Sequence, residues 1–194
     1  IAKAHPDSLF WEILRYNTSH VPWIGGGAWD MIQPAFMFMV GMALPFSSSR
    51  RLADGHDRSK LLLHALWRSL VLVALGVFLT TGTGPQPVFA FHNVLAQIGL
   101  GYVFLTLLRG RGSILQSVAI ALIAAATWTA FALTPVADPS TDYKALGVTD
   151  PGQILGGFWA HWSMNTNFAA SFDQWFLNLF PCETPFVFNR GGYP

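Results

Sequence analysis

Residues 61–81 read LLLHALWRSLVLVALGVFLTT and are the stretch that decides the fold. At about 1.5 Å per residue, a helix of this length covers roughly the 30 Å of hydrocarbon that a membrane-spanning helix must cross. The part from Val71 to Leu79 has almost no polar face, whereas a helix of a soluble protein usually shows one. We therefore expect this stretch to form a transmembrane helix.

Three further apolar stretches have similar lengths and cover residues 29–46, 88–108 and 114–134. The composition agrees with a membrane protein, because 52% of the 194 residues are hydrophobic and only 11% are charged. In soluble domains the charged share is about 25%. The sequence predicts an all-α fold, namely a polytopic transmembrane helix bundle in which residues 1–194 form one partial domain. The lipid bilayer is its expected surroundings.

Basic residues set the expected orientation of the bundle. They lie between the first two and between the last two stretches, at Arg50, Arg51, Arg58, Lys60, Arg109 and Arg111. Because cytoplasmic loops carry an excess of Lys and Arg, residues 1–28 and 135–194 are expected on the extracytoplasmic side. The formal net charge of +1 does not suggest nucleic acid as a partner, and the single cysteine, Cys182, excludes an internal disulfide.

His20 and Asp30 are the candidate catalytic residues. His20 lies in a loop over residues 19–27 whose glycines and proline can bring backbone and side chain close to a substrate. Asp30 stands at the start of an apolar stretch, where placing a carboxylate near the hydrocarbon costs free energy. We therefore expect it to have a specific role. It either caps the helix by accepting backbone N–H bonds or holds an imidazole in one tautomer as support for a general base. The two roles are compatible.

Arg68 is a second costly charge, because it lies inside the apolar stretch 61–81. Such an arginine either reaches the membrane interface with its long side chain or binds a ligand. Together with Arg50 and Arg51 it would form a positively charged opening on the cytoplasmic side, suited to binding the phosphates of a cytoplasmic cofactor. The sequence contains no zinc-ligand spacing, so we expect no metal.

Residues 158–180 read FWAHWSMNTNFAASFDQWFLNLF and combine aromatic with polar side chains. One interpretation is a segment that lies at the membrane interface or packs over the mouth of the bundle. The other is a sugar-binding platform, since aromatic faces cover a pyranose ring while amides and carboxylates pair with its hydroxyls. The candidate sugar-binding residues are Trp23, Asn165, Asn167, Asp173 and Trp175.

The order of residues around His20 resembles the signature of the heparan-alpha-glucosaminide N-acetyltransferase-like membrane acyltransferases. The matching positions are His20-x-x-Trp23-x-Gly25 and Asp30-x-x-x-Pro34-x-Phe36-x-Phe38-x-x-Gly41. Residues 68–76, 93–100 and 189–193 resemble later parts of the family. Ile24 stands where the family usually has asparagine, and Ala96-Gln97 stands where it usually has Gln-Arg.

The resemblance implies a multi-span enzyme that takes an acetyl group from cytosolic acetyl-CoA. The enzyme would deliver this group to the amine or hydroxyl of a sugar or glycan across the membrane, with His20 at the position of the catalytic histidine. It also implies that the chain is a fragment, here expected in the inner (plasma) membrane of a bacterium. A homo-oligomer is compatible with this prediction.

A transporter or flippase half is the alternative function. In such proteins, helices interrupted by prolines line a path through the membrane, as Pro34 and Pro45 could make the first apolar stretch do. A catalytically inactive scaffold is a third and weaker alternative.

Overall fold

The computed structural model describes residues 8–53, 57–82, 84, 86–182 and 184–188, with the backbone alone at residues 48 and 50–53. Helices are the regular secondary structure of these residues, and no strand occurs among them. The α-helices are α1 (Leu9–Asn17), α2 (Ile32–Ala53), α3 (Arg58–Thr81), α4 (Val94–Leu108), α5 (Ser113–Leu133) and α6 (Phe168–Leu177). Two short 3₁₀ helices, η2 (Pro151–Gln153) and η3 (Gly157–Trp162), precede α6. The predicted all-α fold is confirmed for this part of the chain.

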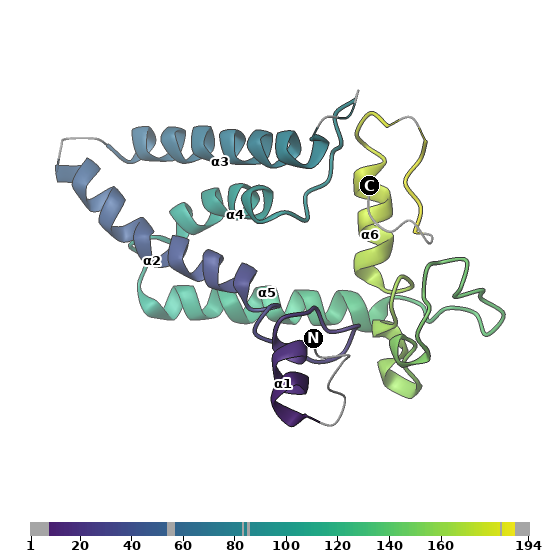
Figure 1. The fold of residues 1–194 in the computed structure, drawn as a ribbon. Coiled ribbons are helices and arrows are strands. Elements are labelled where there is room, and N and C mark those ends of the chain that lie inside the picture. Colours follow the sequence, from purple (N-terminus) through teal and green to yellow (C-terminus); the bar gives the residue numbers. More distant parts are fainter. Residues whose placement is uncertain (1–7, 54–56, 83, 85, 183, 189–194) are drawn as a thin grey trace.

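The four longest helices alternate in direction (Figure 1). α2 and α4 run one way and α3 and α5 run the other way, so the loop before α2 and the segment after α5 lie at the same end. The end of α2, the start of α3 and the turn between α4 and α5 lie at the opposite end, where the basic residues were noted. The alternation agrees with a chain that passes back and forth.

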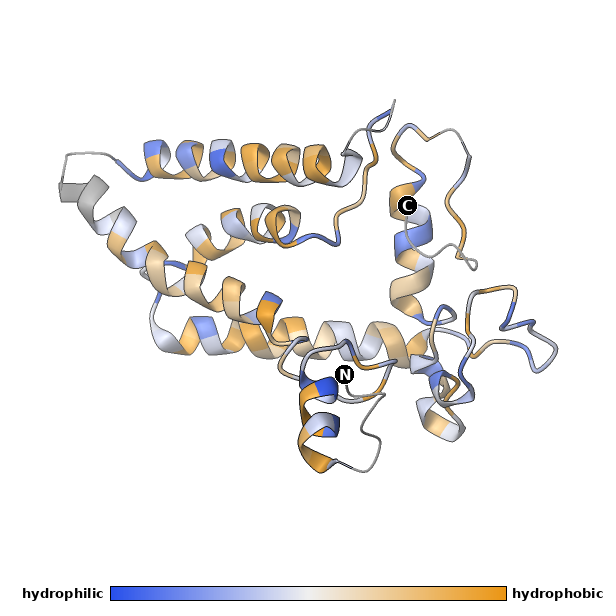
Figure 2. Cartoon of the chain, viewed as in Figure 1, coloured by the Kyte–Doolittle hydropathy of each residue, from blue (hydrophilic) through white to orange (hydrophobic). Residues whose placement is uncertain are grey.

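Two helices of the described residues, α3 and α5, are long and apolar enough to cross a membrane. In a soluble protein such helices would be core helices and mostly buried. Here only 17% of the most apolar window of α3 is buried, and none of that of α5. Figure 2 shows how much of α4 and of the C-terminal half of α3 is hydrophobic. The exposed apolar side chains of α3 and α5 are those that lipid would cover.

The prediction of four spans is wrong for the other two stretches, at least by length and composition. The apolar part of α2 covers Ile32–Ser47, and α4 has 15 residues, or about 22 Å of helix. The predicted start of α4 at residue 88 is too early because Asn93 caps the helix, its side chain accepting a bond from the N–H of Ala96 at 2.9 Å. The predicted start of α2 at residue 29 is also early, because a turn occupies residues 28–31.

α3 and α4 form the tightest pair of helices, because small residues let their backbones approach. A Cβ on Gly99 would lie only 2.8 Å from the carbonyl oxygen of Ser69, and the Ser69 hydroxyl donates to the Gly99 carbonyl at 2.6 Å. α2 crosses this pair, and the amide of Gln33 donates to that of Gln97. The buried core of the three helices consists of Leu44, Ala65, Ile98 and Tyr102.

The segment after α5 packs on the bundle through aromatic rings. At the end of α5, Phe131 stacks on Trp162 of η3 with ring centroids 6.0 Å apart. Phe180, just beyond α6, stacks on Phe89 at 5.1 Å and contacts Phe91 at 5.0 Å. The extended segment that precedes α4 is therefore held by residues from the other end of the chain.

Candidate functional site

The loop between α1 and α2 is fastened to the end of α1. The carbonyl of Asn17 accepts a bond from the backbone N–H of Trp29 at 3.1 Å, and the Asn17 side chain accepts one from the N–H of Ala28 at 3.2 Å. Gly27 is buried, and a Cβ at this position would lie 2.7 Å from the carbonyl oxygen of Tyr16. Since any other residue would push the loop away from α1, Gly27 fixes the backbone that leads to Asp30.

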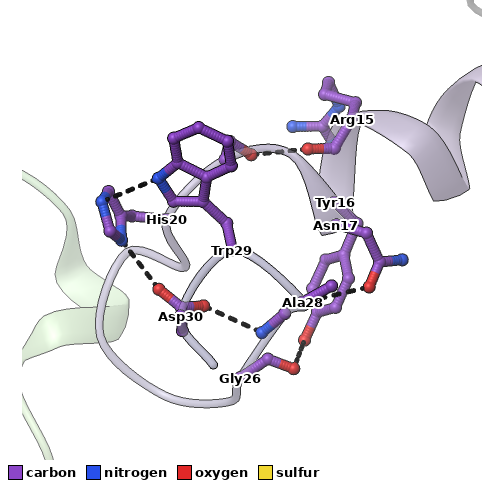
Figure 3. A network of polar contacts seen from close by, with 10 residues as sticks. Arg15, Tyr16, Asn17, His20, Gly26, Ala28, Trp29 and Asp30 are labelled. Atoms are coloured by element: carbon purple, nitrogen blue, oxygen red, sulfur yellow. Dashed lines mark hydrogen bonds and ion pairs between the residues drawn. The ribbon is translucent and has the colours of Figure 1, made fainter. Parts of the chain in front are cut away.

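His20 and Asp30 meet in this loop (Figure 3). His20 Nδ1 lies 2.8 Å from Asp30 Oδ1, and Asp30 Oδ2 accepts a bond from the N–H of Gly27, also at 2.8 Å. The Gly27 bond and then the His20 bond hold the pKa of the Asp30 carboxyl below its ordinary value of 3.8. Asp30 is therefore an ionised acceptor at neutral pH, and both of its oxygens are engaged.

Trp29 contacts the other nitrogen of the His20 ring. Its indole Nε1–H donates to His20 Nε2 at 3.1 Å. Since an indole N–H can only donate, Nε2 must carry a lone pair, and the proton of a neutral ring lies on Nδ1, where it is donated to Asp30. A neutral imidazole held in this tautomer by a carboxylate can take a proton through Nε2.

The pair is accessible, since the side chain of His20 is 75% exposed and that of Asp30 is 25% exposed. Of the two roles considered for Asp30, the contact with the imidazole is present. Its backbone bond goes to Gly27 in the loop, whereas α2 begins only at Ile32. The carboxylate thus stabilises the loop that carries His20.

A pocket lies at the opposite end of α2, between the C-terminal parts of α2 and α4 and the N-terminal half of α3. It is a shallow depression whose space, counted together with the adjoining open solvent, is about 320 Å³. The lining residues are Leu44, Ser47, Leu61, His64, Ala65, Arg68, Tyr102, Thr106 and Arg109. None of these lining residues is acidic. Their polar groups are two guanidinium groups, one imidazole and the hydroxyl groups of Ser47, Tyr102 and Thr106. Such a lining suits an anion.

Arg68 is oriented by Tyr102 across the helix pair. The guanidinium carbon lies 5.1 Å from the centre of the Tyr102 ring, and Nη1 donates to the phenol oxygen at 3.4 Å. Tyr102 is 6% exposed and therefore a fixed support. Arg50 and Arg51 are the other residues that the sequence predicts to bind the cofactor phosphates. Their side chains lie outside the described part of the structure.

The candidate sugar-binding residues are spread over two places. Trp23 donates its indole N–H to the carbonyl of Trp162 at 3.0 Å, which ties the His20 loop to η3. Asn165 adopts φ 58° and donates to the carbonyl of Leu146 at 2.8 Å. Asn167 is 3% exposed, donates to the carbonyl of Ser163 and caps α6. The side chains of both asparagines therefore have structural partners.

Asp173 and Trp175 lie on α6. Asp173 is half-buried, and Trp175 is 59% exposed beside Phe172. Trp175 is thus more exposed than Trp23, which is 37% exposed. The sugar-binding platform stays a prediction, and the aromatic contacts of α6 and η3 show the packing role that was its alternative.

The structure adds four residues that the sequence did not suggest for the site, namely Trp29 at His20, and His64, Tyr102 and Arg109 around Arg68. His64 could have been noticed, because it precedes Arg68 by four residues and so shares its helix face. Tyr102 is 34 residues from Arg68 and carries no such signal. Comparison of the chain with protein-family models, curated proteins and solved structures gives no match.

Proposed function

We propose that this chain is part of an integral-membrane acyltransferase in which His20 is the reacting base. The observation that carries the proposal is the pair formed by His20 Nδ1 and Asp30 Oδ1 at 2.8 Å, anchored by the Gly27 N–H. This arrangement fixes the tautomer in which Nε2 has the lone pair. The resemblance to the membrane acyltransferases around His20 supports the same role.

The proposed reaction uses Nε2 of His20 in one of two ways. In direct transfer, Nε2 takes the proton of a sugar hydroxyl or amine while its oxygen or nitrogen attacks the thioester carbonyl. The carbon–sulfur bond breaks, and the leaving thiolate recovers the proton from Nε2. In a two-step route, Nε2 forms a bond to the thioester carbonyl carbon, and the carbon–sulfur bond breaks to release the thiolate of CoA. The acceptor oxygen or nitrogen then attacks this acyl carbon, the bond to Nε2 breaks, and the acceptor proton passes through the freed Nε2 to the thiolate.

The pocket around Arg68 is the proposed place for the phosphates of the acyl donor, acetyl-CoA. Arg68, Arg109 and His64 line it, and no metal is part of the proposal. The pocket borders Leu44 and Ser47 on α2, about 20 Å along the helix from Asp30. A basic donor site at one end of the bundle and His20 at the other fit a reaction that passes an acyl group across a membrane.

The acceptor is proposed to approach from the end where His20 lies. The segment after α5 shares this end, and the bond from Trp23 to Trp162 joins it to the His20 loop. In the proposed inner-membrane topology this end is extracytoplasmic, so a sugar or glycan reaches His20 without crossing the bilayer.

The test uses the complete protein in liposomes that hold radiolabelled acetyl-CoA, with a sugar amine outside. His20→Ala should lower the rate of acetyl transfer about 10²- to 10⁴-fold, the range that a general base contributes. His161→Gln is the matched control, because His161 lies in the segment at the same end but donates its Nδ1–H to the Thr134 carbonyl, 2.7 Å away. Circular dichroism verifies that both variants are folded.

Transfer at the parent rate by a folded His20→Ala protein would refute the proposal. If the label crossed the bilayer without forming a bond to the acceptor, the chain would instead belong to a transporter or flippase.

A further inference from the structure

Trp29 occupies the ring nitrogen of His20 that the proposed reaction needs. Its indole N–H donates to Nε2 at 3.1 Å, and the two rings meet edge to face with centroids 6.3 Å apart. Asp30 engages Nδ1 at 2.8 Å. Both nitrogens of the exposed imidazole therefore have a partner within the chain (Figure 3).

We infer that Trp29 is a positioning residue that masks Nε2 of His20 until the acceptor displaces the indole. Which reaction is blocked depends on the proposed acyl transfer, whereas the masking of Nε2 depends only on the hydrogen bond from Trp29. Because the indole N–H donates and cannot accept, it favours the tautomer in which Nε2 is unprotonated and Nδ1 carries the proton. An acceptor hydroxyl or amine can replace the indole, since it too donates a hydrogen bond to Nε2.

Trp29 can release the imidazole without unfolding the loop. Its backbone N–H is fixed to the carbonyl of Asn17 at 3.1 Å, while 46% of the residue is exposed. The ring can therefore rotate into solvent about its side-chain bonds as the backbone stays in place. The exchange breaks the bond from the indole to Nε2 and forms one from the acceptor to the same atom.

The masking has a consequence for selectivity. Water also donates hydrogen bonds, so it can reach Nε2 during the fraction of time in which the indole leaves this atom. The bond to Trp29 therefore lowers the rate of acetyl-CoA hydrolysis without abolishing it, whereas an acceptor held by further contacts displaces the indole more often than water does. Removing the indole N–H should therefore raise hydrolysis of acetyl-CoA relative to transfer. A residue with a purely structural role would lower both rates together.

The test compares Trp29→Phe, which keeps a ring but loses the N–H, with the parent protein and with Trp159→Phe. Trp159 is a matched control because it is another exposed tryptophan, at 61% against 46% for Trp29, and lies outside the His20 loop. Two readouts need no enzyme activity: ¹⁵N NMR of the His20 ring, which distinguishes protonated from unprotonated nitrogens, and carbethoxylation of His20 by diethyl pyrocarbonate, followed by mass spectrometry.

In the parent protein at neutral pH, the ¹⁵N spectrum should show Nδ1 protonated and Nε2 unprotonated with a hydrogen-bond shift that Trp29→Phe removes. Carbethoxylation of His20 should become about five-fold faster in Trp29→Phe, the factor that one typical net hydrogen bond is worth, and stay unchanged in Trp159→Phe.

An Nε2-protonated ring in the parent protein would overturn the inference even if Trp29→Phe did not fold. Equal carbethoxylation rates in the folded variants would overturn it as well. Equal carbethoxylation rates leave the proposed function intact, because that function is tested separately by acetyl transfer in folded His20→Ala.

Discussion

Replacing Gly99 by alanine should separate α3 from α4 and weaken the pocket around Arg68. A Cβ at Gly99 would lie 2.8 Å from the carbonyl oxygen of Ser69, 2.8 Å from Val73 Cγ2 and 3.1 Å from Leu72 Cβ. The two shortest contacts fall about 0.6 Å short of the 3.4 Å at which ordinary van der Waals contact begins. One of them is to backbone, so the helices themselves must move.

Gly101→Ala is the matched control, two residues further along the same helix. A Cβ there meets only the flexible end of Met37 at 3.5 Å. Alanine raises intrinsic helix stability by about 1 kcal/mol over glycine at either position, so this gain cancels in the comparison. Overpacking costs about 1–3 kcal/mol. The free energy of unfolding of Gly99→Ala should therefore be about 1–3 kcal/mol below that of Gly101→Ala.

Unfolding of the purified variants in mixed micelles, followed by circular dichroism, measures this difference. Acetyl-CoA affinity should fall in Gly99→Ala alone, because Tyr102 lies one turn from Gly99 and supports Arg68. Equal unfolding free energies for the two variants would refute the close packing of α3 on α4. Equal stability together with unchanged donor affinity would also remove the link between this packing and the pocket.

Two further predictions concern the charges. Arg68→Ala should weaken acetyl-CoA binding about ten-fold or more, as expected for a lost charge-assisted hydrogen bond. Arg111→Ala, which lies outside the pocket lining, should leave the affinity unchanged. Calorimetry measures both affinities, and equal losses would contradict the assignment of Arg68 to the phosphates. Because the Gly27 and His20 bonds lower the pKa of Asp30, its stabilising effect is fully present above the ordinary value of 3.8 and is lost as the pH falls through the lowered pKa. Chemical unfolding of the parent and Asp30→Asn at several pH values should show the parent's advantage closing only below about pH 3.8; an advantage already lost at pH 5 would contradict the bonds found at Asp30.

The sequence predicted closely the two helices that are long and apolar enough to cross a membrane. α3 and α5 begin and end within three residues of the predicted stretches 61–81 and 114–134. A helix satisfies its backbone hydrogen bonds within one segment, and hydropathy is a sum over that segment. Neither property depends on distant partners, so both can be derived from local sequence.

The start of α4 could not be predicted in this way. Residues 88–91 are apolar enough to extend the helix, but Phe89 and Phe91 pack on Phe180 and the helix begins after the Asn93 cap. The contact joins residues about 90 positions apart in the chain, and no periodicity in the sequence records it. For this reason the predicted length of that span was too great.

The candidate site divides along the same line. The spacing of His20 and Asp30, with Gly27 between them, was visible in the sequence because all three lie in one short loop. The position of the Trp29 indole on Nε2, the ring of Tyr102 under Arg68 and the structural bonds of Asn165 and Asn167 were not. Local sequence determined which segments are apolar and which residues carry charge at a cost. The tertiary structure alone decided which donor meets which acceptor, because a hydrogen bond depends on distances and angles that long-range packing fixes.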